Sequence, residues 1–584
     1  HVTDKFDIES VLSFFRQDQV APTQVGSALT ASTQQPGFPS STTDGKPYAW
    51  GTWGAPNWYC ELGGDNKLKV TGINISEMFK YTFNEHFNAV ATFGYNTNNA
   101  TRDIQRTSID WYNYAGTRKV MTNPQQEESN YIKSNSQTDL YTLNAYANWT
   151  QTFADKHDLG VMLGTQYSFK EYDYTTTKAK NILPSLGIIN GIGEVTLVND
   201  NNKGPEKWQE ALLSYFARVN YDYLSKYLLE GNFRYDGSSK FQPENRWAFF
   251  WGVSAGWRLS EEAFMKNLNI FDDLKLRVSY GTVGNQGGID RYDGIQLYNF
   301  NQNKGALIGD EKISYIDTNG KLLSMDREWE TIQNYNIGLD FGLFNQSLYG
   351  SAEYYMKKTK DILVKPPYLA AIGEGGNRWI NGASMENWGL EFNLGYRNKT
   401  RFGMAYDINA NISTYRNKVT KLPADVQNSY GGDGDKDNIL GHPLNSLYGY
   451  VADGIFKTQE DVDNAAEQDG KGLGRIRYRD LNGDGKITDK DRTWIAVQHP
   501  DFIYGLNINL EYRNFDLTMF WQGVFNINVE NIQKYHTDFW SVRETGSNKG
   551  RRLLDAWSPS NPDSDIPAIS ATDTNWENRL STYF

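Results

Sequence analysis

The chain has 584 residues with a formal net charge of −12, and 39% of them are hydrophobic and 14% aromatic. This acidic balance argues against a nucleic-acid-binding protein, because such proteins need basic surfaces. The single cysteine, Cys60, excludes an internal disulfide and a cysteine metal cluster.

Hydropathy excludes a helical membrane protein. No apolar run approaches the ~18 residues that a membrane-spanning helix needs, and the mean hydropathy is −0.64. A membrane β-barrel is still compatible with these values, because its strands give a much weaker hydropathy signal. The 37 Tyr and 17 Trp residues fit two aromatic girdles at the membrane interfaces.

Many segments alternate between apolar and polar residues, which is the pattern of strands with one apolar face. About fifteen such strands are predicted near residues 3–16, 68–81, 87–96, 139–151, 158–170, 210–222, 226–236, 247–258, 273–282, 328–342, 347–358, 385–397, 402–415, 500–511 and 514–525.

The segment from Phe249 to Leu259 shows the alternation most clearly. Every second residue is apolar, including Trp251, Val253 and Trp257, and the residues between them are mostly small or polar. Neighbouring strands place Glu, Arg and Asn on the second face and Tyr or Trp near their ends. A soluble sandwich buries its aromatic residues, so this pattern favours a membrane barrel with lipid outside and water or a plug inside.

The connections between these strands alternate in length. Short links near 84–86, 153–156, 224–225, 344–346, 398–400 and 513 separate long ones near 17–67, 97–138, 171–209, 237–246, 283–327, 359–384, 416–499 and from 526 onward. The link Ser260–Asp272 is an exception, since it falls on the short side yet is moderately long. An up-and-down outer-membrane barrel has short periplasmic turns and long extracellular loops. We therefore expect an all-β, antiparallel transmembrane barrel whose first strand runs outward.

Several motifs resemble those of one family, the SusC/RagA-type TonB-dependent transporters. They include Arg234-Tyr-Asp-Gly-Ser-Ser-Lys-Phe241, Gly256-Trp-Arg-Leu-Ser-Glu261, Leu274-Lys-Leu-Arg277 with Gly284-Asn-Gln286, Asp480-Leu-Asn-Gly-Asp-Gly485 and Pro500-Asp-Phe-Ile-Tyr-Gly505. The resemblance is ordered along the chain and spans at least residues 210 to 525.

The resemblance implies a 22-stranded barrel in the outer membrane of a Gram-negative bacterium, closed by an N-terminal plug. It also implies import of oligosaccharides or oligopeptides, energised through TonB, with a SusD-like lipoprotein over the extracellular mouth. Residues 1–584 then represent part of the barrel. We expect the plug, the TonB-contacting segment, the extension domain and the last strands to lie outside them.

The segment from Asp480 to Asp491 follows the spacing of a calcium-binding loop. The predicted ligands are side chains at positions one, three, five, nine and twelve and a backbone carbonyl at position seven: Asp480, Asn482, Asp484, Lys486, Thr488 and Asp491. Gly485 occupies position six, where the loop turns sharply. The alternative is a turn rich in Asp and Asn that its own backbone hydrogen bonds hold together.

Aromatic residues gather in two predicted extracellular loops. Their flat faces suit sugar rings or peptide side chains, so they are candidate cargo contacts. The candidates are Trp50, Trp53, Trp58, Trp111 and Tyr112. The alternative is that these loops pack on one another or on the lid protein.

No enzymatic activity is expected, because the six histidines are scattered and the HExxH, GxSxG and P-loop spacings do not occur. Two alternatives to an active importer stay open. One is a passive porin or structural barrel of the outer membrane, and the other is a soluble secreted glycan-binding β-protein.

Overall fold

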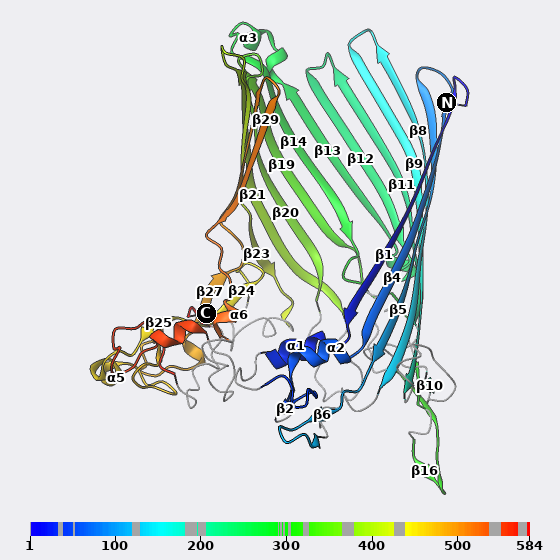
Figure 1. The fold of residues 1–584 in the computed structure, drawn as a ribbon. Helices are drawn as coiled ribbons and strands as arrows, with labels where there is room; N and C mark the ends of the chain where they lie inside the picture. Colours follow the sequence, from blue (N-terminus) through cyan, green and yellow to red (C-terminus); the bar gives the residue numbers. More distant parts are fainter. Residues whose placement is uncertain are drawn as a thin grey trace.

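The computed structural model describes residues 2–32, 39–50, 53–119, 129–180, 195–196, 206–289, 291–292, 295, 298–301, 305–318, 326–364, 379–424, 439–535, 550–569 and 581–583. Most of them belong to one 17-stranded antiparallel sheet, which forms a tall curved wall (Figure 1). β10 (Val195–Thr196) pairs with β9, and β23 (Arg416–Lys421) pairs with β21 as a continuation of β22 across a two-residue break.

The remaining fifteen strands pair in chain order, each with the next, as an up-and-down meander. They are β1 (Phe6–Pro22), β4 (Asp65–Thr82), β5 (Phe87–Arg106), β8 (Asn130–Phe153), β9 (His157–Lys180), β11 (Glu206–Tyr223), β12 (Tyr227–Ser238), β13 (Trp247–Arg258), β14 (Phe271–Asn285), β19 (Glu330–Leu343), β20 (Leu348–Val364), β21 (Ile380–Lys399), β22 (Ala405–Ser413), β28 (Phe502–Tyr512) and β29 (Phe515–Phe525). β1 and β29 are the edges, each with one partner among the described strands.

All fifteen predicted strands coincide with these strands, but several are longer than predicted. β5 runs to Arg106 and stays paired with β8 back to Asn130, well beyond the predicted ends at 96 and 139. In this extension Thr97, Asn99 and Thr101 occupy the face that is apolar further down the strand. The apolar–polar alternation of β5 therefore ends before its backbone pairing does, because both faces of the extension carry polar residues.

One face of the sheet carries a continuous apolar layer, which we call the outer wall. Register places Phe233 beside Trp251, and their neighbours Val253 and Tyr280 beside each other further along the same face. Phe233, Trp251 and Val253 are exposed in the isolated chain, and Tyr280 is half-buried. The opposite face, which we call the inner wall, carries the alternate polar residues. This division is the one that lipid outside and water inside impose on a membrane barrel.

A single carboxylate interrupts the apolar row of β4. Glu77 lies on the outer wall between Ile75 and Phe79, opposite Ser10 of β1 and Phe93 of β5. The Ser10 hydroxyl donates a hydrogen bond to the carboxylate. Because apolar residues precede and follow it on the strand, Glu77 lies within the apolar band.

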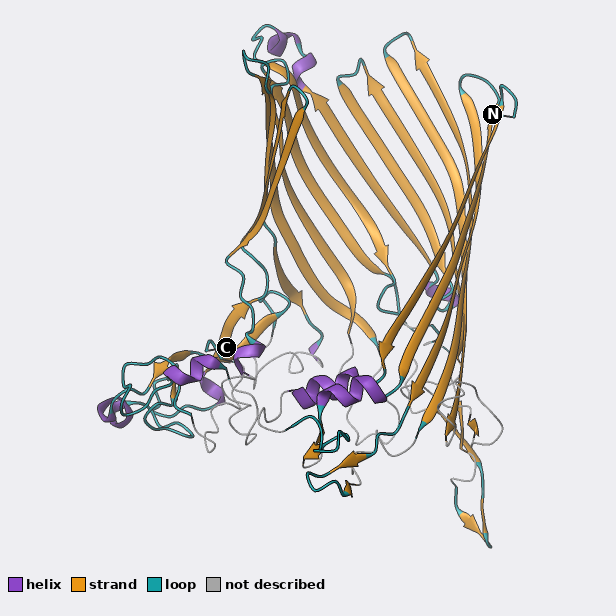
Figure 2. Ribbon diagram, viewed as in Figure 1, coloured by secondary structure: helices purple, strands orange, loops and turns teal. Residues whose placement is uncertain are grey.

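The two ends of the sheet differ sharply. At one end, the short-turn end, hairpins close within a few residues that adopt positive φ, among them Leu224, Ser225 and Asn345. Such backbone angles match the twist of tight hairpins. At the other end, the long-loop end, the extended connections gather (Figure 2). This asymmetry agrees with the prediction from connection lengths.

The connections carry small elements. These are α1 (Val25–Ser32), β2 (Ala49–Trp50), β3 (Trp53–Gly54), α2 (Pro56–Leu62), β6 (Trp111–Tyr112), β7 (Arg118–Lys119), η3 (Pro243–Asn245), η4 (Leu259–Glu261), α3 (Ala263–Lys266), β15 (Tyr298–Asn301), β16 (Leu307–Ile308), β17 (Glu311–Lys312), β18 (Tyr315–Thr318), β24 (Ser446–Tyr450), β25 (Ala452–Ile455), α5 (Gln459–Asn464), β26 (Ile476–Tyr478), η6 (Asp489–Asp491), β27 (Arg492–Val497), α6 (Ile532–Tyr535) and η8 (Arg551–Asp555). Within the described residues, every helix is too short or too polar to cross a membrane.

Candidate functional site

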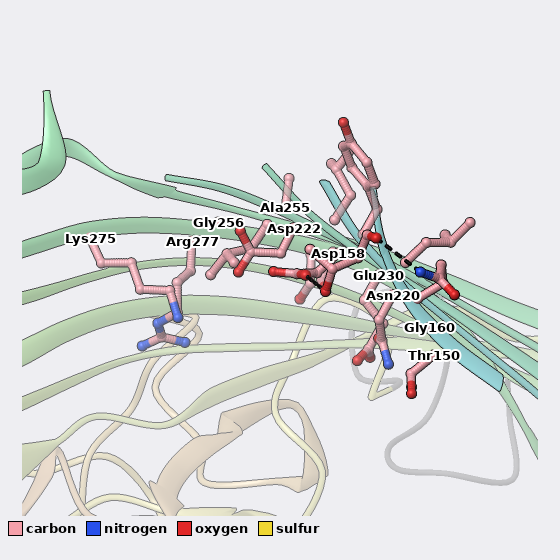
Figure 3. A pocket seen from close by; sticks show the side chains of 18 of the residues that line it. Thr150, Asp158, Gly160, Asn220, Asp222, Glu230, Ala255, Gly256, Lys275 and Arg277 are labelled. Carbon is pink, nitrogen blue, oxygen red and sulfur yellow. Dashed lines mark hydrogen bonds between the residues drawn. The ribbon is translucent and has the colours of Figure 1, made fainter. Parts of the chain in front are cut away.

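The inner wall is hollowed near the short-turn end. The hollow has a volume of about 870 Å³ and is lined by neighbouring strands from β8 to β19 (Figure 3). Its floor carries small inward residues, Gly160, Ser254 and Gly256, which leave room above the backbone. Charged residues surround this floor, with Asp158, Asp222 and Glu230 on one side and Lys275 and Arg277 on the other.

Arg277 of β14 joins three adjacent strands at the edge of the hollow. Its Nε lies 2.8 Å from Asp340 Oδ2 on β19, and its Nη1 lies 3.3 Å from Glu353 Oε2 on β20. Asn336 donates a further hydrogen bond to Glu353. A Cβ at Gly338 would lie 2.8 Å from Arg277 Nη2, so glycine at that position leaves space for the guanidinium.

The carboxylates on the other side of the hollow are held by local donors. Thr152 donates to Asp158 at 2.5 Å, and Asn232 donates to Glu230 at 2.6 Å. Lys275 is half-buried and has no hydrogen bond or ion pair with the side chains of the described residues. The hollow thus presents fixed negative charges to the lumen, together with Lys275, which is unpaired among the described residues. This arrangement suits contact with a polar, charged surface.

At the long-loop end, α1, α2, β2, β3, β6 and β7 form a first loop body beside the mouth of the wall (Figure 1). Its core packs Tyr59 against Trp111, with ring centroids 5.0 Å apart, together with Ala28, Ala49 and Ile109. The indole of Trp111 is only 1% exposed. Trp111 is therefore a core residue of the loop body, and its contact with cargo stays a prediction.

The other aromatic candidates have different surroundings. Trp58 packs against the same core and its Nε1 donates to the Ser40 carbonyl at 2.7 Å. The ring of Tyr112 lies under the Lys46 ammonium at 5.0 Å. Trp50 and Trp53 face each other in the β2–β3 hairpin, and their side chains lie outside the described residues. Contact of these four residues with cargo stays a prediction.

A second loop body contains β24, β25, α5, β26 and β27, and segments near the end of the chain pack on it. Tyr450 and Tyr478 form its core with Ile476. Lys457 pairs with Asp565 at 2.7 Å, and Tyr450 forms a backbone bridge with Ser581. The loop predicted at 416–499 is therefore a small folded unit stabilised by residues about a hundred positions later in the chain.

The predicted calcium loop lies in this second body. The Asp480 carboxylate accepts hydrogen bonds from the amides of Gly483 at 2.7 Å and Gly485 at 2.8 Å, and these bonds hold the pKa of Asp480 below its usual value. Asp491 is buried and accepts from the amides of Leu481 at 3.0 Å and Thr488 at 2.8 Å. Gly485 has a φ of +79°, as the sharp turn requires.

The remaining predicted ligands lie at the exposed side of the same turn. The Asp484 carboxylate accepts hydrogen bonds from the Asn482 side-chain amide at 3.1 Å and from the backbone amide of Lys486 at 2.9 Å. The hydroxyl of Thr488 lies 3.3 Å from Asp491 Oδ2. In the part of the chain that the structure describes, no three His, Cys, Asp or Glu side chains converge as a metal cluster. Backbone hydrogen bonds hold the turn, and calcium binding stays a prediction.

A further cluster at the mouth was not among the predicted sites. Tyr172 of β9 stacks near Trp208 of β11, with ring centroids 5.2 Å apart. Arg291 covers Trp208 at 3.4 Å and pairs with Glu210 at 2.7 Å. The sequence offers no signal for this contact, because Arg291 comes from a long loop whose position follows only from the folded structure.

Comparisons with known proteins agree with this architecture. The family described as TonB dependent receptor-like, beta-barrel matches residues 22–532. TonB-dependent receptor P26 of Formosa agariphila is 32% identical over 371 residues, which are 61% of this chain and 36% of that protein. TonB-dependent receptor SusC of Bacteroides thetaiotaomicron is 30% identical over 361 residues, which are 60% of this chain and 34% of that protein.

A solved structure shares the fold. The RagAB peptide importer in its open-open state superposes with a TM-score of 0.77 at 19% identity, over 100% of this chain and 61% of that one. The chain thus corresponds to about a third of the curated relatives' length and to under two thirds of the RagAB chain. The resemblance to SusC/RagA-type barrels is confirmed, and the chain belongs to the TonB dependent receptor-like β-barrel family of the Gram-negative outer membrane.

Proposed function

We propose that this barrel takes part in TonB-dependent active import of oligosaccharides or oligopeptides across the outer membrane, together with a SusD-like surface lipoprotein. The observation that supports the proposal best is the charged hollow of the inner wall at the short-turn end. A passive pore needs an open lumen, whereas this wall offers fixed carboxylates, and a lysine without a partner in the described part of the chain, to a polar body inside it. The plug of the full-length transporter is that body.

The hollow lies where energy coupling must act. The short-turn end is the periplasmic end of an outer-membrane barrel. A plug held there by Lys275, Asp222 and Glu230 through exposed polar contacts can leave the wall at modest cost, since half-exposed ion pairs contribute little free energy each. Arg277 is already bound to Asp340 and Glu353, so it keeps the wall rigid while the plug moves.

The two loop bodies supply the extracellular rim. Each has its own apolar core, so each is a preformed surface rather than a loose chain. Preformed surfaces favour a stable protein interface because little conformational entropy is lost on binding. We propose that the SusD-like partner rests on these bodies and traps cargo above the lumen. The cargo crosses without chemical change, so the protein is not an enzyme in this proposal.

The Asp480–Asp491 loop is proposed to bind a structural Ca²⁺. Each carboxylate keeps acceptor capacity beyond the amide bonds it already accepts, and Gly485 provides the required turn. Titration calorimetry should show binding at roughly 10⁻⁴–10⁻³ M. Asp480→Asn should abolish the heat, whereas Asp463→Asn, an exposed change on α5 of the same body, should leave it unchanged. Equal heat from all three proteins would contradict the calcium proposal.

The import proposal is tested through the partner. The full-length protein should co-purify in detergent with a SusD-like lipoprotein whose interface exceeds roughly 2,000 Å², as permanent complexes do. Deleting the partner should stop growth on the cargo while the barrel stays folded in the membrane. If the barrel purifies alone and lets small solutes diffuse without energy, it is a porin. Recovery in the soluble fraction would favour a secreted glycan-binding protein.

A further inference from the structure

One connection at the short-turn end differs from its neighbours. Residues 259–270 link β13 to β14 through η4 and α3, and we call this segment the elbow. Neighbouring hairpins at this end close within a few residues, as at Leu224–Ser225. Figure 1 shows α3 standing beyond the rim of the wall at this end. A longer connection here is therefore an added structure and not a requirement of the hairpin.

The elbow is attached to the lipid side of the rim. The Glu262 carboxylate accepts hydrogen bonds from the Tyr227 hydroxyl at 2.6 Å and from Trp257 Nε1 at 3.2 Å, and it pairs with Lys226 at 3.5 Å. Tyr227 and Trp257 are cross-strand partners on the outer wall, with stacked rings. Glu262 thus joins the start of the elbow to the aromatic girdle that faces the membrane.

The elbow exposes apolar side chains that no part of the described chain covers. Phe264, Leu268 and Ile270 are 57%, 55% and 50% exposed. The charged side chains of the elbow, in contrast, form ion pairs. Glu261 pairs with Lys266 at 2.7 Å and with Arg258 at 4.0 Å. The polar groups therefore neutralise one another near the strand ends, while the apolar groups project outward.

We propose that the elbow is a membrane-interface anchor whose Phe264, Leu268 and Ile270 enter the periplasmic leaflet of the outer membrane. The apolar surface continues the outer wall, which already contacts lipid, through the girdle residues Tyr227 and Trp257. Lys226 and Lys266 pair with Glu262 and Glu261 of the elbow, so two cations lie beside this surface, where the proposed anchor would meet phosphate headgroups. Aromatic and aliphatic side chains with adjacent lysines are the composition of segments that lie in the interface.

A periplasmic protein is the competing occupant, and two observations favour lipid. Glu262 directs the elbow toward the outer wall and not across the lumen, where a plug-directed protein would act. The exposed groups are an aromatic ring and two branched aliphatic chains without a free carboxylate beside them, since Glu261 and Glu262 are both paired. The anchor does not depend on what the transporter carries.

Spin labelling measures the depth of the elbow directly. The full-length protein with Cys60→Ser receives one cysteine at a time, as Phe264→Cys, Leu268→Cys or Ile270→Cys, and each is labelled with a nitroxide in phosphatidylethanolamine–phosphatidylglycerol vesicles. Phe93→Cys on the outer wall is the lipid reference. Leu554→Cys, at an 83% exposed position of the extracellular segment η8, is the water reference. The ratio of oxygen to nickel-chelate collisions at 264, 268 and 270 should exceed that at 554 several-fold and approach that at 93.

Labels at 264 and 268 that meet the nickel chelate as freely as the label at 554 would overturn the proposal. Labels that become shielded only when a periplasmic protein is added would also overturn it, because the surface would then dock protein. A second measurement uses Phe264→Ser with Leu268→Ser. This variant should unfold at a lower temperature than wild type in vesicles but not in detergent, whereas Leu554→Ser should behave as wild type in both. If the double variant also unfolded at a lower temperature than wild type in detergent, the two side chains would have a role in folding instead.

Discussion

Arg277 and Asp340 form a two-pronged ion pair across β14 and β19, with Nε–Oδ2 at 2.8 Å and Nη2–Oδ1 at 2.9 Å. Both oxygens of the carboxylate are thus fixed by one planar group, which is the geometry in which Arg differs from Lys. The pair lies on the inner wall at the edge of the charged hollow. It connects strands whose pairing defines the wall on which the plug is proposed to rest.

Arg277→Met should destabilise the folded barrel by about 1–2 kcal/mol, because Asp340 and Glu353 lose their shared cation while each is still partly buried. The estimate is below that for a fully buried pair, since each side chain is about a third exposed and solvent screens the charges. Unfolding in urea, followed by the gel shift of the folded barrel, measures the change. Lys275→Met on the same face of β14 removes an unpaired cation and should have little effect. Equal losses for the two variants would contradict the role of the ion pair.

Glu77→Leu should raise the free energy of unfolding by roughly 1–2 kcal/mol in lipid vesicles, because a charged group on the lipid face costs about that much. Ser10→Ala should destabilise the wild type, since it removes the hydroxyl that donates to Glu77. The same serine change should be nearly neutral in the Glu77→Leu background. The four proteins form a double-mutant cycle, and a coupling energy of zero would show that the two side chains do not interact in the membrane.

Gly54→Ala should destabilise the folded first loop body by about 1–3 kcal/mol, because an added methyl group overpacks its core. A Cβ at residue 54 would lie 2.2 Å from the Trp111 ring, so the indole would have to move. Gly26→Ala is a matched control, because a Cβ there meets no atom of the described residues within 4 Å. Limited proteolysis of the loop body reports the difference. Equal cleavage of the two variants would show that Trp111 is not packed on Gly54.

The second loop body should become less stable in acid through Asp480. Backbone hydrogen bonds, that from Gly485 first, hold the pKa of this carboxyl below its usual value. A lowered folded-state pKa means that the stabilisation is present above the unfolded pKa of about 3.9 and is lost as the pH falls through the lowered value. Digestion by an acid-active protease at a series of falling pH values measures this loss. The second loop body should still resist cleavage just below pH ~4 and become sensitive at lower pH. Asp480→Asn should remove this pH dependence, and an unchanged profile would assign it to another group.

Much of the fold follows from periodicity. The strand from Phe249 was predicted because every second side chain faces lipid, and a period of two identifies both the strand and its faces. The extensions of β5 and β8 beyond Thr97 and Asp139 have polar residues on both faces, so no periodic signal marks them. Connection length also predicted the two ends of the wall, including the unusual Ser260–Asp272 link, which overlaps the elbow.

The candidate sites were less predictable, since they depend on residues distant in sequence. Arg277 could be placed on the inner wall by alternation, but its partners are 63 and 76 residues away and are known only from register. Trp111 has the composition of a ligand-binding aromatic, and only the packing of two separate loops shows that it is a core residue. Loop aromatics carry no periodicity that would separate these two roles.

We propose that the barrel imports cargo only when it is energised through TonB. Its most direct test is uptake of a labelled oligosaccharide or oligopeptide that supports growth, in cells with and without functional TonB and with the partner lipoprotein present in both. Uptake should be saturable with TonB and fall to background without it, at equal amounts of folded barrel in the outer membrane. Uptake that is unchanged without TonB and rises linearly with cargo concentration would contradict it.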